Sequence, residues 1–135
     1  MALENTARAR TVLSDLRDRG ILVAIDDFGS GYSALTYLRD LPVDEVKLDR
    51  DFIAPIAHDP RAAALARAVI DVAHVLCLTT VAEGVENAET VDVLRGLGCD
   101  YVQGYFFSPP LTAEQVLELA ALRTTTPDIG ELADI

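Results

Sequence analysis

The stretch ILVAIDDFGSG (residues 21–31) changes abruptly from an apolar run to acidic and glycine-rich residues. Ile21–Ile25 is short and wholly apolar, which is typical of a strand buried on both faces of a parallel sheet. The aspartates and glycines that follow at once are residues that interrupt regular structure and favour turns. The sequence therefore predicts a buried parallel strand with polar groups directly beyond its carboxyl end.

The rest of the chain alternates in the same way between helix and strand patterns. Strands that alternate with helices pair in parallel through right-handed crossovers. A closed (β/α)₈ barrel needs eight strands and about 250 residues, so a chain with about four strands is either a small open α/β domain or about half of a barrel. Helices are expected over Ala2–Arg19 and Ser33–Leu38, after Asp59-Pro60 with an apolar stripe of Leu65, Val69, Val72, Ala73 and Leu76, between Asn87 and Gly98, and after Thr112 and Gln115; further strands are expected over Val46–Leu48, Thr79–Ala82 and Tyr101-Val102.

Composition and charge limit the classes of function. The chain has 135 residues, of which 50% are hydrophobic and 24% are charged, as in one folded domain and unlike a disordered chain. Eleven basic residues against 22 acidic ones give a net charge of −11. This charge argues against a nucleic-acid polymer as partner, because phosphates are neutralised by clustered Lys and Arg. A small phosphorylated ligand held through metal ions is still allowed.

Location and redox state follow from what the sequence lacks. Ala62–Leu78, the best candidate for a membrane span, is interrupted by charged residues and is short of the ~20 apolar residues needed. The segment MALENTARAR has no apolar signal-peptide core, so a cytoplasmic protein is expected. Cys77 and Cys99 lack metal-ligand spacing and are expected to be buried, reduced thiols. Residues 124–135 are expected to form a flexible acidic tail.

Polar residues follow each predicted strand. Because parallel strands place their carboxyl ends at one rim, these groups are expected to converge there. Several carboxylates on one rim would repel each other, and Mg²⁺ or Mn²⁺ would offset that charge and bridge to a substrate phosphate. The pattern therefore favours metal-assisted hydrolysis of a phosphate ester. The groups are Asp26 and Asp27 after the first strand, Lys47 and Asp49 on the second, Glu83 and Glu86 after the third, and Gln103 after the fourth.

Each of these residues has a purely structural alternative. Asp26 and Asp27 could cap the following turn, and Lys47 could pair with Asp49 alone. The two glutamates could be solvated loop charges, and Gln103 could be a hydrogen-bonded core amide. The shared placement of the residues at strand ends, and not any one of them, is the signal for function.

Four ordered segments carry a resemblance to a known family. They are DDFGSGYS (residues 26–33), VKLD (46–49), VAEGVE (81–86) and QGY (103–105) followed by SPPL (108–111). Together they resemble the C-terminal half of an EAL domain, the bacterial family of cyclic-di-GMP phosphodiesterases, from about Leu3 to Leu122. On this basis residues 1–123 are expected to form a truncated EAL domain.

The resemblance implies a partial TIM-type barrel that uses Mg²⁺ or Mn²⁺ to hydrolyse cyclic di-GMP to pGpG. It also implies a role for each matched residue: Asp26 and Asp27 bind the metal ions, Lys47 holds the attacking water, Glu83 is the general base, Gln103 binds substrate, and Asp49 and Glu86 support the metals. Phe28, Gly29 and Gly31 belong to the segment 28–33, a regulatory and dimer-contacting loop in the family, in which Ser30 stands where Thr or Ala is common.

The resemblance places the family's Glu-Ala-Leu strand, and other metal ligands, upstream of the matched region. The chain is therefore expected to be inactive alone and to need a complementing barrel half. A second hypothesis is a non-catalytic signalling or interaction module that forms a homodimer through its open barrel face. A third is an unrelated α/β metal-dependent phosphatase, which an open doubly wound strand order would favour.

Overall fold

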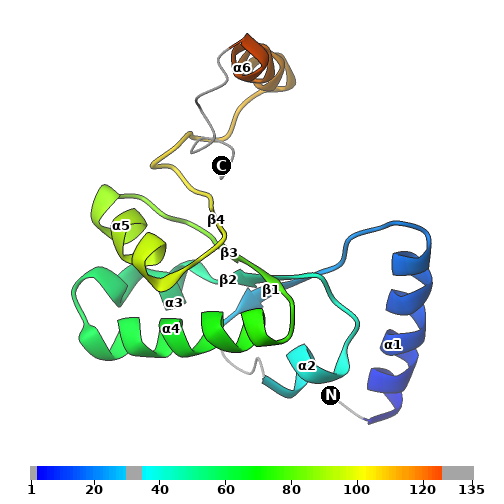
Figure 1. Ribbon diagram of the computed structural model, residues 1–135. Helices are drawn as coiled ribbons and strands as arrows, with labels where there is room; N and C mark the ends of the chain where they lie inside the picture. Colours follow the sequence, from blue (N-terminus) through cyan, green and yellow to red (C-terminus); the bar gives the residue numbers. More distant parts are fainter. Residues whose placement is uncertain (1–2, 30–34, 126–135) are drawn as a thin grey trace.

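The fold is an arc of four parallel strands, seen in a computed structural model that describes residues 3–29 and 35–125. The strand order is β1-β2-β3-β4, the order of the chain itself, and Figure 1 shows the strands side by side at the centre of the molecule. Neighbours that follow chain order are typical of a barrel wall, whereas a doubly wound sheet reverses at a switch point. The strands are β1 (Ala24–Phe28), β2 (Glu45–Leu48), β3 (Thr79–Ala82) and β4 (Tyr101–Val102).

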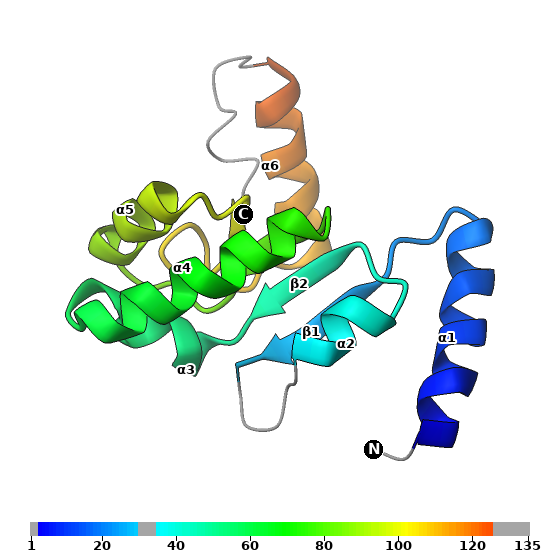
Figure 2. The same cartoon turned by 60° about the horizontal axis from the view of Figure 1, so that its bottom comes forward.

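Helices connect the strands and cover one face of the sheet. In Figures 1 and 2, α4 and α5 lie together over β2 and β3, whereas α1 and α6 lie at separate ends of the molecule. This arrangement confirms the expected partial TIM-type α/β architecture and excludes the doubly wound alternative. The helices are α1 (Leu3–Asp18), α2 (Leu35–Asp40), α3 (Arg50–Ile53), the 3₁₀ turn η1 (Ala54–Ala57), α4 (Pro60–Val75), α5 (Ala88–Leu97) and α6 (Ala113–Thr125).

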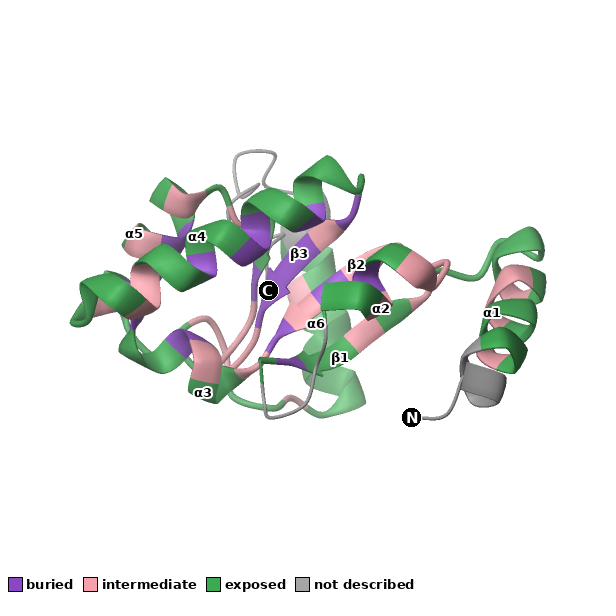
Figure 3. Ribbon diagram, turned by 90° about the horizontal axis from the view of Figure 1, so that it is seen from below, coloured by how far each residue is buried: buried purple, intermediate pink, exposed green. Residues whose placement is uncertain are grey.

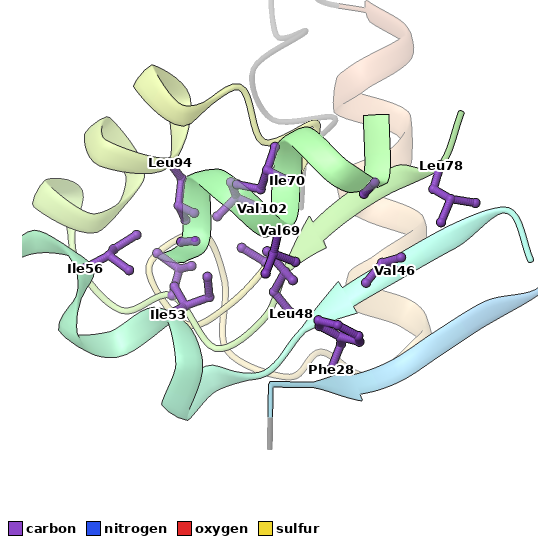
Figure 4. Close-up of a cluster of buried hydrophobic side chains, with 14 of the residues drawn as sticks. Phe28, Val46, Leu48, Ile53, Ile56, Val69, Ile70, Leu78, Leu94 and Val102 are labelled. Atoms are coloured by element: carbon purple, nitrogen blue, oxygen red, sulfur yellow. The ribbon is translucent and has the colours of Figure 1, made fainter. Parts of the chain in front are cut away.

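The hydrophobic core lies between the sheet and these helices. Along β2, Val46 and Leu48 are completely buried and Lys47 between them is not, because successive side chains of a strand point to opposite faces. Figure 4 shows Val46 and Leu48 on the strands below Ile70 of α4, and Leu94 of α5 beside Ile70. Burying each such side chain contributes about 1.5–3 kcal/mol. Figure 3 shows buried residues on the strands and on the helices that pack against them. Lys47 lies on the opposite face of the sheet, the face that lines the interior of a closed barrel.

The predicted capping residues of α4, α5 and α6 are confirmed, whereas the short helix expected over Ser33–Leu38 is described from Leu35 and ends at Asp40. The side chain of Asp59 accepts a hydrogen bond of 2.9 Å from the backbone amide two residues on, and Asn87 accepts one of 2.8 Å three residues on. Gly98 ends α5 in the left-handed conformation, with φ of +83°. Thr112 and Gln115 form the expected capping box, in which each side chain accepts from the other's backbone amide.

The first strand differs from its prediction. It runs from Ala24 to Phe28 instead of Ile21 to Ile25, so it includes both aspartates. Ile21 and Leu22 precede it and are 48% and 80% exposed, which contradicts burial on both faces. The physical reason is that β1 is an edge strand of the described sheet, with only β2 beside it.

Two other expectations about burial are wrong. The stripe on α4 is rotated, because Ala66, Val69, Ile70 and Ala73 face the sheet while Leu65, Val72 and Leu76 are exposed. Both cysteines are free thiols, but Cys77 is exposed in the turn that ends α4 and Cys99 is half-buried. Of the tail expected over residues 124–135, Thr124 and Thr125 instead belong to α6, and the rest lies outside the described residues. Within the described parts, no helix combines the length and the apolar character that crossing a membrane requires.

Candidate active site

Three carboxylates converge at the carboxyl ends of the strands. One oxygen each from Asp26, Asp27 and Glu83 lies within 4.8 Å of the others, although the aspartates come from β1 and the glutamate follows β3. The aspartates are exposed and Glu83 is half-buried. Oxygen ligands at this spacing suit a divalent cation such as Mg²⁺ or Mn²⁺. The structure thus brings together the three acidic residues for which the sequence predicted metal and proton-transfer roles.

A local irregularity explains how two consecutive aspartates serve one site. In a regular strand, Asp26 and Asp27 would point to opposite faces of the sheet. Here the register with β2 shifts between Ile25 and Phe28, and Asp27 has a left-handed φ of +53°. The side chain of Asp26 accepts a 2.8 Å hydrogen bond from the backbone amide of Asp27. This bulge-like end of β1 turns both carboxylates toward the rim while Phe28 is buried in the core.

A positive charge and an amide complete the group. Lys47 Nζ lies 3.6 Å from Glu83 Oε1, and Gln103 Nε2 lies 3.5 Å from the same oxygen. Lys47 therefore faces the carboxylates and does not pair with Asp49 alone. Gln103 is likewise a rim residue and not a core amide, so β1, β2, β3 and β4 each place a polar side chain at this end of the sheet.

The environment of Glu83 disfavours its charged form. Partial burial, followed by the negative charge of Asp26, raises the pKa of this carboxyl above its usual range, although the ammonium group of Lys47 opposes the shift. A bound proton or cation would therefore stabilise this carboxylate by offsetting its negative charge. The excess of negative charge over the single ammonium is therefore a local electrostatic reason for cation binding.

Asp49 and Glu86 have other partners. Asp49 is the N-cap of α3, and its side chain accepts a 3.0 Å hydrogen bond from the amide of Asp51. Glu86 is exposed and forms a 3.1 Å ion pair with Arg50. Neither belongs to the carboxylate group, so their supporting role stays a prediction. Gly29 is described and packs against α3, whereas Gly31 lies outside the described residues.

A groove of about 590 Å³ adjoins the site on the β4 side. Its polar wall is formed by Arg50, Glu86 and Gln103, and its apolar wall includes Pro109 and Leu111. No sequence pattern pointed to Arg50 or to the groove. Asp49 as a preferred helix-capping residue was the available signal for α3, but a single helical turn leaves little periodicity to detect.

The comparison with known proteins identifies the family, because the EAL domain matches this chain over residues 1–110. The chain belongs to the EAL domain family. Among curated proteins, it is 44% identical over 115 residues to "Signaling protein YkoW" of Bacillus subtilis and 49% identical over 100 residues to "Cyclic di-GMP phosphodiesterase NbdA" of Pseudomonas aeruginosa. These matches cover 85% and 74% of this chain but only 14% and 13% of the relatives.

Solved EAL structures confirm the fold and its extent. The EAL domain of Mycobacterium smegmatis DcpA superimposes with a TM-score of 0.83 at 41% identity, over 87% of this chain and 52% of the other. A manganese and cyclic-di-GMP complex of Klebsiella pneumoniae BlrP1 superimposes with a TM-score of 0.70 at 39% identity, over 75% of this chain and 26% of that one. The chain thus has the fold of part of an EAL domain and spans about half the length of the DcpA EAL domain.

Proposed function

We propose that this chain supplies one half of a cyclic-di-GMP phosphodiesterase site and that residues 1–123 form this half of the barrel. The observation that carries the proposal is the group of Asp26, Asp27 and Glu83 with Lys47 beside it, at the rim of a parallel arc. The reaction is hydrolysis of one phosphodiester of cyclic di-GMP to linear pGpG. Water forms the new P–O bond, the P–O3′ bond breaks, and the ribose O3′ leaves as a hydroxyl group.

The residues present fit the metal ions that the family implies. Asp26, Asp27 and Glu83 offer hard oxygen donors within 4.8 Å of one another, and Mg²⁺ and Mn²⁺ prefer such donors. When bound, these ions supply Lewis-acid stabilisation of the phosphoryl oxygens and lower the pKa of bound water. Asp26 and Asp27 would hold them from β1, where the left-handed Asp27 directs both carboxylates to one rim.

Lys47 and Glu83 are suited to handle the attacking water. Lys47 Nζ can donate a hydrogen bond that positions the water, and Glu83 Oε1, 3.6 Å away, can accept its proton. The raised pKa of Glu83 favours this role, because a general base works best when its pKa approaches the operating pH. Neither side chain contributes to the hydrophobic core between the sheet and the helices.

Gln103 and the adjoining groove are suited to a guanine base. The groove of about 590 Å³ falls within the ~300–1,000 Å³ range of small-molecule sites. The Gln103 amide and the Arg50 guanidinium offer hydrogen bonds to the base edge, and Pro109 offers an apolar surface to its face. A cytoplasmic location, as expected from the sequence, is part of the proposal.

We expect the 135-residue chain to be inactive alone. It spans about half of a solved EAL domain, and an arc of strands leaves its inner face and two edges without the partners that a closed barrel provides. The test mixes the chain with the N-terminal half of an EAL domain and Mn²⁺ and measures pGpG by chromatography. Hydrolysis by the mixture but by neither half supports the proposal; a folded, associated mixture without hydrolysis contradicts it.

Matched variants assign the activity to the proposed residues. Lys47→Met should abolish pGpG formation by the mixture, because the water loses its donor. Asp92→Asn should leave it unchanged, since Asp92 is an exposed residue of α5 outside the site. Equal activity of the two variants would mean that Lys47 has no part in the reaction.

A second candidate is a non-catalytic module that dimerises through the open barrel face. The exposure of an aromatic side chain on that face favours it: Tyr101 of β4, in register with Val81 and through it with Lys47, is 45% exposed. Light scattering distinguishes this candidate: a dimer of the chain supports it, and a stable monomer excludes it.

A further inference from the structure

The single turn of α3 lies between the end of β1, which carries two of the carboxylates, and the loop after β3, which carries the third. It begins directly after Asp49, whose backbone amide donates a 2.9 Å hydrogen bond to the carbonyl of Phe28. On the other side, the amide of Glu83 donates a 3.0 Å bond to the carbonyl of Leu48. Residues 48 and 49 are therefore hydrogen-bonded both to the end of β1 and to the start of the loop after β3.

The side chain of Phe52, on this turn, occupies the space beside Gly29. A Cβ atom at Gly29 would lie only 2.7–2.8 Å from three atoms of Phe52, which is closer than such contacts occur. Gly29 also has a φ of +99°, which favours glycine. The close approach of ring and backbone thus fixes where the chain leaves β1, immediately after the two aspartates.

The loop after β3 is packed on the same turn. A Cβ at Gly84, with φ of +70°, would lie 2.7 Å from the side-chain stem of Arg50, and the Arg50 guanidinium pairs with Glu86 at 3.1 Å. The single turn of α3 therefore separates the end of β1, which carries Asp26 and Asp27, from the loop after β3, which carries Glu83. Phe52 contacts the first segment and Arg50 contacts the second.

The carboxylates need such a support. Asp26 and Asp27 are exposed, and their negative charges repel that of Glu83 although the three groups lie within 4.8 Å of one another. Asp27 sits in a left-handed conformation that costs energy for a residue with a side chain. Phe28 anchors this bulge from the core side, where it is 4% exposed.

We propose that Phe52 is a positioning residue for the metal site: its ring, packed on Gly29, holds Asp26 and Asp27 within reach of Glu83. The part of this inference that concerns metal affinity rests on the proposed function, whereas the packing itself does not. Residues that orient ligands without touching the metal typically change its affinity by about 10–100-fold when they are mutated.

The first test measures Mn²⁺ affinity by electron paramagnetic resonance of the free ion, in the complex of this chain with an N-terminal EAL half. Phe52→Ala should weaken binding by about tenfold or more, and Phe52→Leu, which refills much of the volume, should recover most of it. Val91→Ala is the matched control, since Val91 is buried on α5 away from the site. It should lower stability without changing the Mn²⁺ affinity.

The second test needs no metal and uses the 135-residue chain alone. Hydrogen exchange followed by mass spectrometry should show faster exchange over residues 24–29 in Phe52→Ala, with α5 unchanged, and no such local effect in Val91→Ala. The inference is overturned if residues 24–29 exchange alike in the two variants. It is also overturned if Phe52→Ala binds Mn²⁺ as the wild type does. If wild type binds no Mn²⁺, the proposed function fails while the exchange result still decides the packing role.

Discussion

Lys47 Nζ lies 3.6 Å from Glu83 Oε1, although the two residues are not register partners. Lys47 is paired in the sheet with Val81, and Glu83 comes one residue after the end of β3. The long lysine side chain therefore extends along the inner face of the sheet toward the rim, and its ammonium group lies near the carboxylates. One positive charge among three acidic groups leaves the rim with a net negative charge, and the stability and cation affinity of the chain should both depend on it.

Replacing Glu83 with Gln should stabilise the metal-free chain at neutral pH. The raised pKa means that the folded state binds a proton on Glu83 more tightly than the unfolded state does. Stability is therefore lost as the pH rises from below the ordinary value of 4.5 through the raised value. Urea denaturation at pH 7.5 with a chelator should give Glu83→Gln a gain below about 1 kcal/mol, the scale of partly exposed charge interactions.

The pH dependence is the control for this effect. At about pH 4 and below, Glu83 is largely protonated, so wild type and Glu83→Gln should have nearly the same stability. A variant that is less stable than wild type at pH 7.5 would show that the ion pair with Lys47 outweighs burial and the repulsion from Asp26.

Replacing Asp26 with Asn should weaken Mn²⁺ binding by the complex with an N-terminal EAL half. The loss should be at least about tenfold, because even residues that only orient ligands have effects of 10–100-fold. Calorimetric titration measures the affinity directly, and the exposed Asp92→Asn on α5 serves as the charge-matched control. Equal affinities of the two variants would remove Asp26 from the ligand set.

The sequence was informative where local rules decide the structure. Asp59, Asn87 and Gly98 act through hydrogen bonds and backbone conformation within one helix turn, so their roles could be predicted without tertiary information. The convergence of Asp26 and Glu83 could also be predicted, because parallel strands place their carboxyl ends together.

Tertiary packing decided what was missed. The left-handed Asp27 depends on the register shift against β2, which no pattern within residues 21–31 reveals. The rotation of α4 depends on which residues meet the sheet, and Leu65 has the same helical spacing as buried Val69 but is 56% exposed. The packing of Phe52 on Gly29 joins residues 23 positions apart and likewise has no local signal.

A hydrogen-bonded group around buried Thr80, at the opposite end of the sheet, should be important for stability. Asp100 accepts hydrogen bonds from the backbone amide of Thr80 at 2.8 Å and from its hydroxyl at 3.0 Å, and its other neighbour is His74 Nε2 at 2.8 Å. Thr80 is fully buried, so losing the carboxylate leaves its backbone amide without this acceptor, while its hydroxyl keeps the contact with Cys99 Sγ at 3.7 Å. Asp100→Ala should therefore lower the free energy of unfolding by about 1–3 kcal/mol, measured by urea denaturation at pH 7.

Acid should remove this contribution. Burial alone would raise the pKa of Asp100, but the bonds from Thr80 and His74 outweigh it and lower the pKa below 3.8. The stabilisation is thus present above the ordinary value and is lost as the pH falls through the folded value. The stability difference between wild type and Asp100→Asn should shrink in acid, and a difference that grows as the pH falls would contradict this assignment.

Two glycines near the end of α5 should respond to alanine in opposite directions. Gly96 lies within the helix, and a Cβ there would meet nothing within 4 Å, so Gly96→Ala should stabilise the chain by about 0.5–1 kcal/mol through helix propensity. Gly98 has a φ of +83° and ends the helix, and Gly98→Ala should cost about 1–2 kcal/mol because a side chain disfavours this conformation. Thermal unfolding of the two variants measures both effects, and a rise in Tm for Gly98→Ala would mean that α5 does not end in the left-handed cap. Since the two substitutions add the same methyl group two residues apart, the sign of each effect reports the backbone conformation and not the added hydrophobic surface.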